Sequence, residues 1–202
     1  MTKTTYHHKD LKNTLLLTGI RLINEQGVEA FSMRKLAIAC EVSHMAPYKH
    51  FQDKEAFLKE ITSHIEKEFY ESLRITAQQY HDDPARCIYE LGKTYVSFIG
   101  SHIDYLKFYF LGMHQHNITP NDIKQVSSES ALGVFRDCTL RFLKTTNIAK
   151  EYYDDEVMLY WAIPMGFVTL YGFNIIQKDQ DYLARIESIM KREVEIRINA
   201  SR

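Results

Sequence analysis

The chain has 202 residues, of which 45% are hydrophobic and 25% charged, so it is long enough to bury one or two helical cores. Its formal net charge of −1 argues against attraction to nucleic acid through a strongly basic tail. Its three cysteines are widely separated and form no C-x-x-C pair, so they predict reduced thiols in a cytoplasmic protein and indicate neither a disulfide framework nor a zinc site.

The first predicted helix covers residues 10–26. Apolar residues recur along it at helical spacing, and Gly27 is a typical C-cap. Ser32 then predicts the N-cap of a short helix over Met33 to Cys40. The side of this short helix that we expect to be buried consists of Met33, Leu36 and Ala37.

A turn at Glu41 leads to a second short helix, which we expect to begin at the N-cap Ser43 and to end near His50. Pro47 is compatible with this helix, because a proline in the first turn removes only one intrahelical bond. Asp53 predicts the cap of a longer helix that follows. Two short helices supported by longer neighbours predict a helix-turn-helix domain, whose second short helix enters the major groove of DNA.

These features resemble the N-terminal domain of the TetR family of transcriptional regulators. The resemblance covers about residues 10 to 58 and rests on Gly27, Ser43 and a Tyr-x-x-Phe-x-x-Lys-Glu motif. The motif consists here of Tyr48, Phe51, Lys54 and Glu55. Glu41 departs from the family, which often has glycine at the turn. A positive φ at Glu41 would cost about 1 kcal/mol.

We expect the DNA contacts to lie on and beside the two short helices. The resemblance implies phosphate contacts from Tyr48 and from the region of Lys54 at the start of the following helix, and base or backbone contacts from Ser43, His44 and Lys49. The residues themselves agree, since tyrosine offers a hydroxyl and lysine neutralises phosphate. A buried role for Tyr48 and a solvated role for His44 stay open as alternatives. The predicted DNA-contacting residues are Ser32, Arg34, Ser43, His44, Met45, Tyr48, Lys49 and Lys54.

Beyond residue 53 the sequence predicts helices and no strands. Two helix starts are marked by Asp83-Pro84 and Thr119-Pro120. The expected helices span about residues 54–80, 84–100, 103–113, 120–146, 154–177 and 180–199. We therefore predict an all-α protein. It has an N-terminal helix-turn-helix DNA-binding domain at residues 1–53 and a larger helical effector-binding and dimerisation domain at residues 54–202.

The segment from Val157 to Ile176 contains no charged residue. It is long enough to span a membrane, but its acidic flanks and Pro164 argue against that. An apolar helix in a soluble protein packs on its own core and on a second subunit. We predict a homodimer, and the TetR resemblance implies that residues 154–199 form its interface. The stretch from Trp161 to Gly166 is similar to the Trp-x-x-x-His-Gly motif of a TetR subgroup, with Met165 in place of histidine.

Aromatic residues of the second domain are numerous enough to line a cavity for a small hydrophobic or aromatic ligand. Each of them, taken singly, is more typical of a core. The TetR resemblance implies that such an effector weakens operator binding and releases repression. The predicted effector-binding residues are Tyr95, Phe98, Tyr109, Met113, Phe135, Trp161 and Met165. No cofactor is predicted.

Two other functions fit parts of the sequence. His114 and His116, with His102 nearby, suggest a metal-responsive regulator, although residues two apart on a helix point in different directions. A helical protein-binding adaptor without DNA activity explains the aromatic residues but not the segment from Ser43 to Phe51. We expect no enzymatic activity, because G-x-S-x-G, H-E-x-x-H and phosphate-loop motifs are absent from the sequence.

Overall fold

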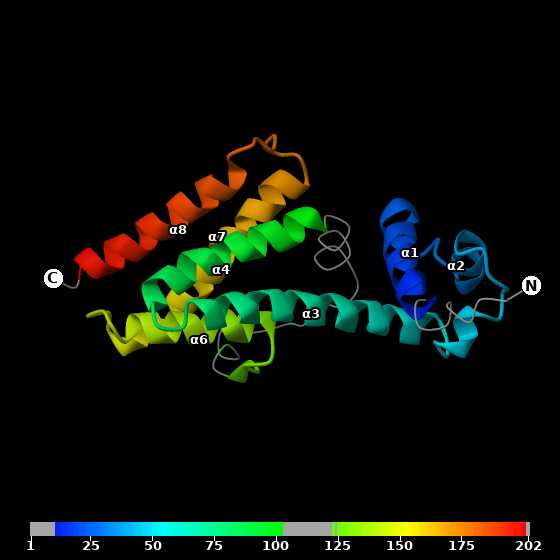
Figure 1. Ribbon diagram of the computed structural model, residues 1–202, viewed down its shortest axis with the longest axis horizontal. Helices are drawn as coiled ribbons and strands as arrows, with labels where there is room; N and C mark the ends of the chain where they lie inside the picture. Colours follow the sequence, from blue (N-terminus) through cyan, green and yellow to red (C-terminus); the bar gives the residue numbers. More distant parts are fainter. Residues whose placement is uncertain (1–10, 103–122, 124, 201–202) are drawn as a thin grey trace, which may run out of the picture. The chain divides into compact units, whose positions relative to one another are not determined.

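The computed structural model of the protein describes residues 11–102, 123 and 125–200 (Figure 1). All regular elements in this part of the chain are helical, as predicted. In chain order they are α1 (Leu11–Gln26), α2 (Met33–Ala39), η1 (Pro47–Lys49), α3 (Lys54–Gln79), α4 (Pro84–Ser101), α6 (Ala131–Leu143), η3 (Lys150–Tyr152), α7 (Tyr153–Gly172) and α8 (Tyr182–Asn199). The helix expected at 103–113 and the Thr119-Pro120 start lie outside the described residues.

The described residues form two compact units. The first unit contains residues 11–65, and the second contains residues 66–102 together with the described residues from 123 onward. The division falls within α3, later than the predicted boundary at residue 53. The reason is that Phe57 and Ile61, in the first turns of α3, are completely buried in the core of the first unit.

Short-range hydrogen bonds fix where the helices of the first unit begin and end. The Ser32 hydroxyl accepts from the backbone N–H of Lys35 at 3.2 Å, and the Asp53 carboxylate accepts from that of Ala56 at 2.8 Å. Both predicted N-caps are therefore confirmed. Gly27, with a φ of +78°, follows the end of α1 as predicted.

The aromatic ring of Phe57 lies at the centre of the first unit. It stacks on Phe31 with 5.3 Å between ring centroids and meets Phe51 edge-on at 4.8 Å. Gly19 of α1 lies so close that a Cβ there would stand 2.3 Å from the Phe57 ring. One ring thus holds together α1, the segments on either side of the two short helices, and α3. The stripe predicted to be buried, Met33, Leu36 and Ala37, is buried.

The second unit is organised around α4, which packs against α6, α7 and α8 (Figure 1). The part of α3 that belongs to this unit also meets α4. Phe69 contacts Tyr95 edge-on at 4.9 Å, and the hydroxyls of Thr76 and Thr94 are hydrogen-bonded at 2.8 Å. The Asp83-Pro84 start of α4 is confirmed, because the Asp83 carboxylate caps the helix.

The prediction of one helix over residues 120–146 is wrong, because α6 begins only at Ala131. The Ser130 hydroxyl accepts from the Gly133 N–H at 3.1 Å and donates to the Ser127 carbonyl at 2.7 Å, which makes a new helix start. Gly133 permits the close approach of the preceding turn, since a Cβ there would lie 2.0 Å from the Ser127 carbonyl oxygen.

The last two helices also differ in detail from their predicted limits. α7 ends at Gly172 and not at residue 177, because Asn174 adopts a φ of +54° and the Phe173 N–H closes the helix on Thr169. The three acidic residues in the first turn of α7 suit the positive end of its helix dipole. None of the helices described has the length and apolar character needed to cross a membrane.

Candidate DNA-binding site

The turn after α2 has a left-handed residue at the position where the TetR family often has glycine. Glu41 has a φ of +54°, which favours glycine. The turn is closed by hydrogen bonds from the Glu41 N–H to Ile38 and from the Val42 N–H to Ala37, both at 3.0 Å. Glutamate at this position carries a backbone strain of about 1 kcal/mol.

The second short helix is a 3₁₀ turn, so the predicted α-helix from Ser43 to His50 is wrong. Only Pro47–Lys49 is helical, and its start at Ala46 has no side-chain cap, so Ser43 is not an N-cap. The Ala46 N–H donates to the Ser43 carbonyl at 2.9 Å. Pro47 has no N–H with which to continue an α-helical ladder from that carbonyl.

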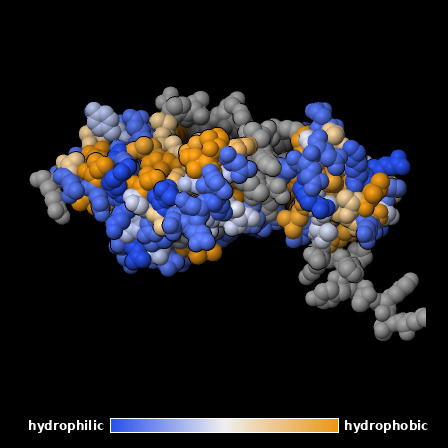
Figure 2. All heavy atoms as spheres, turned by 90° about the horizontal axis from the view of Figure 1, so that it is seen from above, coloured by the Kyte–Doolittle hydropathy of each residue, from blue (hydrophilic) through white to orange (hydrophobic). Residues whose placement is uncertain are grey.

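Apart from the buried Ala46 and Pro47, the side chains from Ser43 to Lys49 lie at the surface of the first unit. Tyr48 is 47% exposed and Met45 is 66% exposed, which contradicts the alternative of a buried Tyr48. Figure 2 shows hydrophilic and hydrophobic residues side by side on the surface of this unit. The other predicted contacts that are exposed are Arg34, Ser43, His44 and Lys49.

One exposed apolar residue was missed by the sequence reasoning. Ile38 on α2 is 59% exposed. The helical period contained the signal, since Ile38 falls off the stripe formed by Met33, Leu36 and Ala37.

Two predicted DNA contacts take part in intramolecular bonds. The Lys54 ammonium donates to the Val28 carbonyl at 2.6 Å and to the Phe31 carbonyl at 3.1 Å. It therefore anchors the segment before α2, while the predicted phosphate contact in the region of Lys54 stays a prediction. The Ser32 oxygen accepts the capping bond from Lys35, which leaves the hydroxyl proton as the part that can donate to a phosphate.

Four of the predicted effector residues meet in one aromatic cluster of the second unit. Trp161 lies edge-on to Tyr95 at 5.1 Å and to Phe135 at 5.2 Å. Phe69 of α3, which the sequence reasoning missed, lies at 4.9 Å from Tyr95 and stacks on Phe98 at 5.1 Å. Tyr95 and Phe135 are completely buried, whereas Phe98 and Trp161 are partly exposed.

The three other predicted effector residues are Met165, Tyr109 and Met113. Met165 is partly exposed and lies one turn after Trp161 on α7. Tyr109 and Met113 lie outside the described residues.

The histidines considered as metal ligands do not form a site in the described part of the chain. His102 has its Nδ1 atom 2.8 Å from the Phe98 carbonyl oxygen. His114 and His116 lie outside the described residues. Among the residues described, no group of three His, Cys, Asp or Glu side chains is arranged to hold a metal ion.

The exposed turn and short helices, held on an all-α scaffold, define a helix-turn-helix DNA-binding domain. Residues 15–61 match the sequence model of the bacterial regulatory proteins of the tetR family. Over 47 residues the chain is 43% identical to tetracycline repressor protein class G of Vibrio anguillarum. That match covers 23% of this chain and 22% of the repressor. The N-terminal unit therefore has a DNA-binding domain of the TetR type.

Solved structures share the fold over nearly the whole chain. The TetR-family transcriptional regulator of Pectobacterium atrosepticum has a TM-score of 0.57 at 16% identity, covering 98% of this chain and 97% of its own. That of Haemophilus influenzae has a TM-score of 0.65 at 15% identity, covering 91% and 96%. A protein of unknown function from Rhodococcus sp. RHA1 reaches 0.71 at 20% identity, covering 95% and 98%. The predicted all-α TetR-like fold is confirmed.

The strain at the turn gives a testable prediction. Glu41→Gly is expected to raise the free energy of unfolding by up to about 1 kcal/mol, because glycine adopts this φ without a Cβ clash. Glu41→Ala keeps the Cβ and is expected to give no such gain. Chemical denaturation of the three proteins measures the difference. A Glu41→Gly protein no more stable than Glu41→Ala contradicts the strain.

Proposed function

We propose that the chain is a TetR-type transcriptional regulator. It binds a two-fold operator as a homodimer and acts in the cytoplasm as a repressor that a small hydrophobic or aromatic effector releases. The observation that carries the proposal is the exposed segment 43–49 within a domain matching the TetR-family sequence model. Its first residues, Ser43 and His44, are polar and exposed, as contacts to base edges require.

The side chains of the first unit supply the chemistry for this binding. Lys49 and Arg34 are exposed cations that release counterions from phosphates. Tyr48 presents its hydroxyl to a phosphate oxygen. The exposed apolar groups of Met45 and Ile38 suit contact with thymine methyl groups.

The predicted phosphate contact in the region of Lys54 is assigned in this proposal to backbone N–H groups. The Lys54 ammonium is held by two carbonyls, but the residue is the first of α3, a helix of 26 residues. The N–H groups at such a helix start attract a phosphate.

The first test is a titration of the purified protein on DNA from upstream of its own gene. We expect selective, salt-sensitive binding that Tyr48→Ala and Lys49→Ala weaken. Lys49→Ala should also lower the slope of log affinity against log salt by about 1 for each bound subunit. The control is Lys144→Ala, which removes the same charge at an exposed position of the second unit.

Two outcomes would contradict the proposal that the chain is a transcriptional regulator. In the first, the wild type binds unrelated DNA equally well. In the second, Lys144→Ala weakens binding as much as Lys49→Ala does. Selective capture of a protein partner without DNA binding would favour the adaptor function instead.

We place the proposed dimer interface on α7, α8 and the segment between them. This part of the chain exposes more large apolar side chains than an isolated subunit needs. They are Met158, Leu170, Phe173, Ile175, Ile176 and Ile196. A helix-turn-helix protein reads two half-sites about 34 Å apart with two copies, so the DNA function requires such an interface.

Leu170→Asp is expected to convert the dimer into a monomer, because it places a charge in the apolar interface. Light scattering should then report the subunit mass of 23.8 kDa for this variant and twice that mass for the wild type. The matched control is Ile75→Asp, at an exposed position of α3 outside the proposed interface. A Leu170→Asp protein that stays dimeric rejects this interface.

We place the effector at the partly exposed side of the aromatic cluster, where Phe98 and Trp161 lie. The buried rings of Tyr95 and Phe135 form its apolar floor. A bound aromatic molecule would shift the balance between conformations that differ in operator affinity.

Trp161 is the only tryptophan of the chain and reports on this site directly. We expect a subset of a panel of apolar and aromatic molecules to change its fluorescence and to weaken operator binding at the same concentrations. Phe98→Ala should shift the concentration of molecule at which the fluorescence changes. Tyr152→Ala, at an exposed aromatic position of η3, should leave that concentration unchanged. If no molecule of a broad panel changes the operator affinity, the proposal of a hydrophobic or aromatic effector is contradicted.

A further inference from the structure

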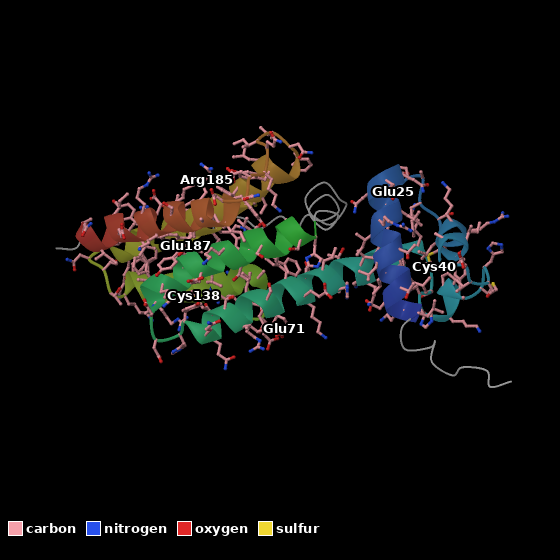
Figure 3. The ribbon with its side chains drawn as sticks, turned by 45° about the horizontal axis from the view of Figure 1, so that its top comes forward. Glu25, Cys40, Glu71, Cys138, Arg185 and Glu187 are labelled. Atoms are coloured by element: carbon pink, nitrogen blue, oxygen red, sulfur yellow. The ribbon has the colours of Figure 1, made fainter. Side chains whose placement is uncertain are left out.

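Two cysteines that are 51 residues apart in sequence meet inside the second unit. The Sγ atoms of Cys87 on α4 and Cys138 on α6 are 3.0 Å apart, and both side chains are buried. Both are free thiols, as is Cys40. Figure 3 shows Cys138 among the helices of the second unit and Cys40 in the first unit. The spacing of the cysteines in the sequence gave no indication of this pair.

Arg141, one turn after Cys138 on α6, lies against both sulfur atoms. Its Nη2 atom is 3.1 Å from Cys138 Sγ and 3.9 Å from Cys87 Sγ. Its Nη1 atom donates to the His81 carbonyl at 3.1 Å, which holds the guanidinium in place. A fixed positive charge beside a thiol favours the thiolate.

These contacts make the two thiols unequal. The hydrogen bond donated by the Cys87 S–H and the nearby guanidinium of Arg141 lower the pKa of Cys138, against the opposite effect of burial. The same hydrogen bond, together with burial, raises the pKa of Cys87. Cys138 is therefore placed to act as the nucleophilic thiolate, with Cys87 as the neighbouring thiol that reacts second.

We propose that Cys87 and Cys138 form an oxidation site for hydrogen peroxide and similarly small hydroperoxides. The Cys138 thiolate attacks one peroxide oxygen, the O–O bond breaks, and the departing hydroxide takes up a proton to become water. The Cys87 sulfur then attacks the sulfenic sulfur of Cys138, and the S–O bond breaks. The released hydroxide takes the Cys87 proton and leaves as the second water.

The balance is two thiols and one hydrogen peroxide giving one disulfide and two water molecules. The sulfur atoms, now 3.0 Å apart, must approach to about 2.05 Å, so the product links α4 to α6 with a small movement. A pair buried behind an arginine side chain admits a small neutral oxidant and excludes a bulky one. Oxidised glutathione is thus expected to react slowly.

The test treats the full chain with hydrogen peroxide. The expected product is an intramolecular Cys87–Cys138 disulfide, seen as a loss of two hydrogens by intact mass, a fall from three free thiols to one, and a linked peptide pair. Cys87→Ser should accumulate a sulfenic acid on Cys138, which dimedone traps. Cys40→Ser should form the disulfide as the wild type does.

Arg141→Gln tests the role of the charge and is expected to slow disulfide formation about tenfold, the effect of one pKa unit on the thiolate fraction. The control is Arg86→Gln, next to Cys87 in sequence but paired with Glu90. Thermal melting compares the fold of each variant with that of the wild type. Because every readout is chemical, the outcome does not depend on DNA binding.

Four results would overturn the proposal. The first is oxidation confined to Cys40, and the second is a disulfide that forms only between two chains. The third is dimedone trapping on Cys87 in the Cys138→Ser protein as fast as the wild type is oxidised. The fourth is an equal rate of oxidation by peroxide and by oxidised glutathione. If Arg141→Gln folds and forms the disulfide at the wild-type rate, the Arg141 guanidinium has no role in the reaction.

Discussion

The packing around the Phe57 ring is the constraint on which the proposed DNA-binding surface depends. The ring contacts Phe31 before α2 and Phe51 after η1, and it closes against Gly19 of α1. Segments that have little regular structure of their own are thereby held at fixed points on α3. The Lys54 ammonium adds a second attachment at the same place. Close-packed aromatic contacts of this kind tolerate little movement, so a three-residue 3₁₀ helix can present its side chains in one arrangement.

The sequence predicted best those features that depend on residues a few positions apart. The caps at Ser32, Asp53 and Asp83 are confirmed, because a side-chain oxygen and the N–H three residues later meet whenever the chain turns into a helix. The helical order of the described elements follows from the same local periodicity. The resemblance marked Glu41 as the position where the family often has glycine, and the structure gives it a positive φ.

The features that the sequence did not predict involve contacts between residues whose meeting the local pattern does not determine. Lysine is usually a surface residue, yet the Lys54 ammonium donates to carbonyls more than twenty positions earlier. A glycine such as Gly133 normally destabilises the interior of a helix. Here its missing Cβ permits the close approach of the Ser127 carbonyl. Phe69 was overlooked because its contacts with Tyr95 and Phe98 join residues more than twenty positions apart in sequence. The DNA-contacting set was therefore easier to propose than the aromatic cluster, whose members come from four helices.

The aromatic cluster and the thiol pair both contain contacts between α4 and α6. Tyr95 and Phe135 join α4 to α6, and Cys87 and Cys138 join the same helices at another level. α4 also packs against α7 and α8, so a change at its contact with α6 alters the packing of the helix that organises the unit. Phe69 connects this cluster to the part of α3 that belongs to the second unit. Under the proposed function, effector binding and thiol oxidation would thus bias one packing equilibrium and not two independent ones.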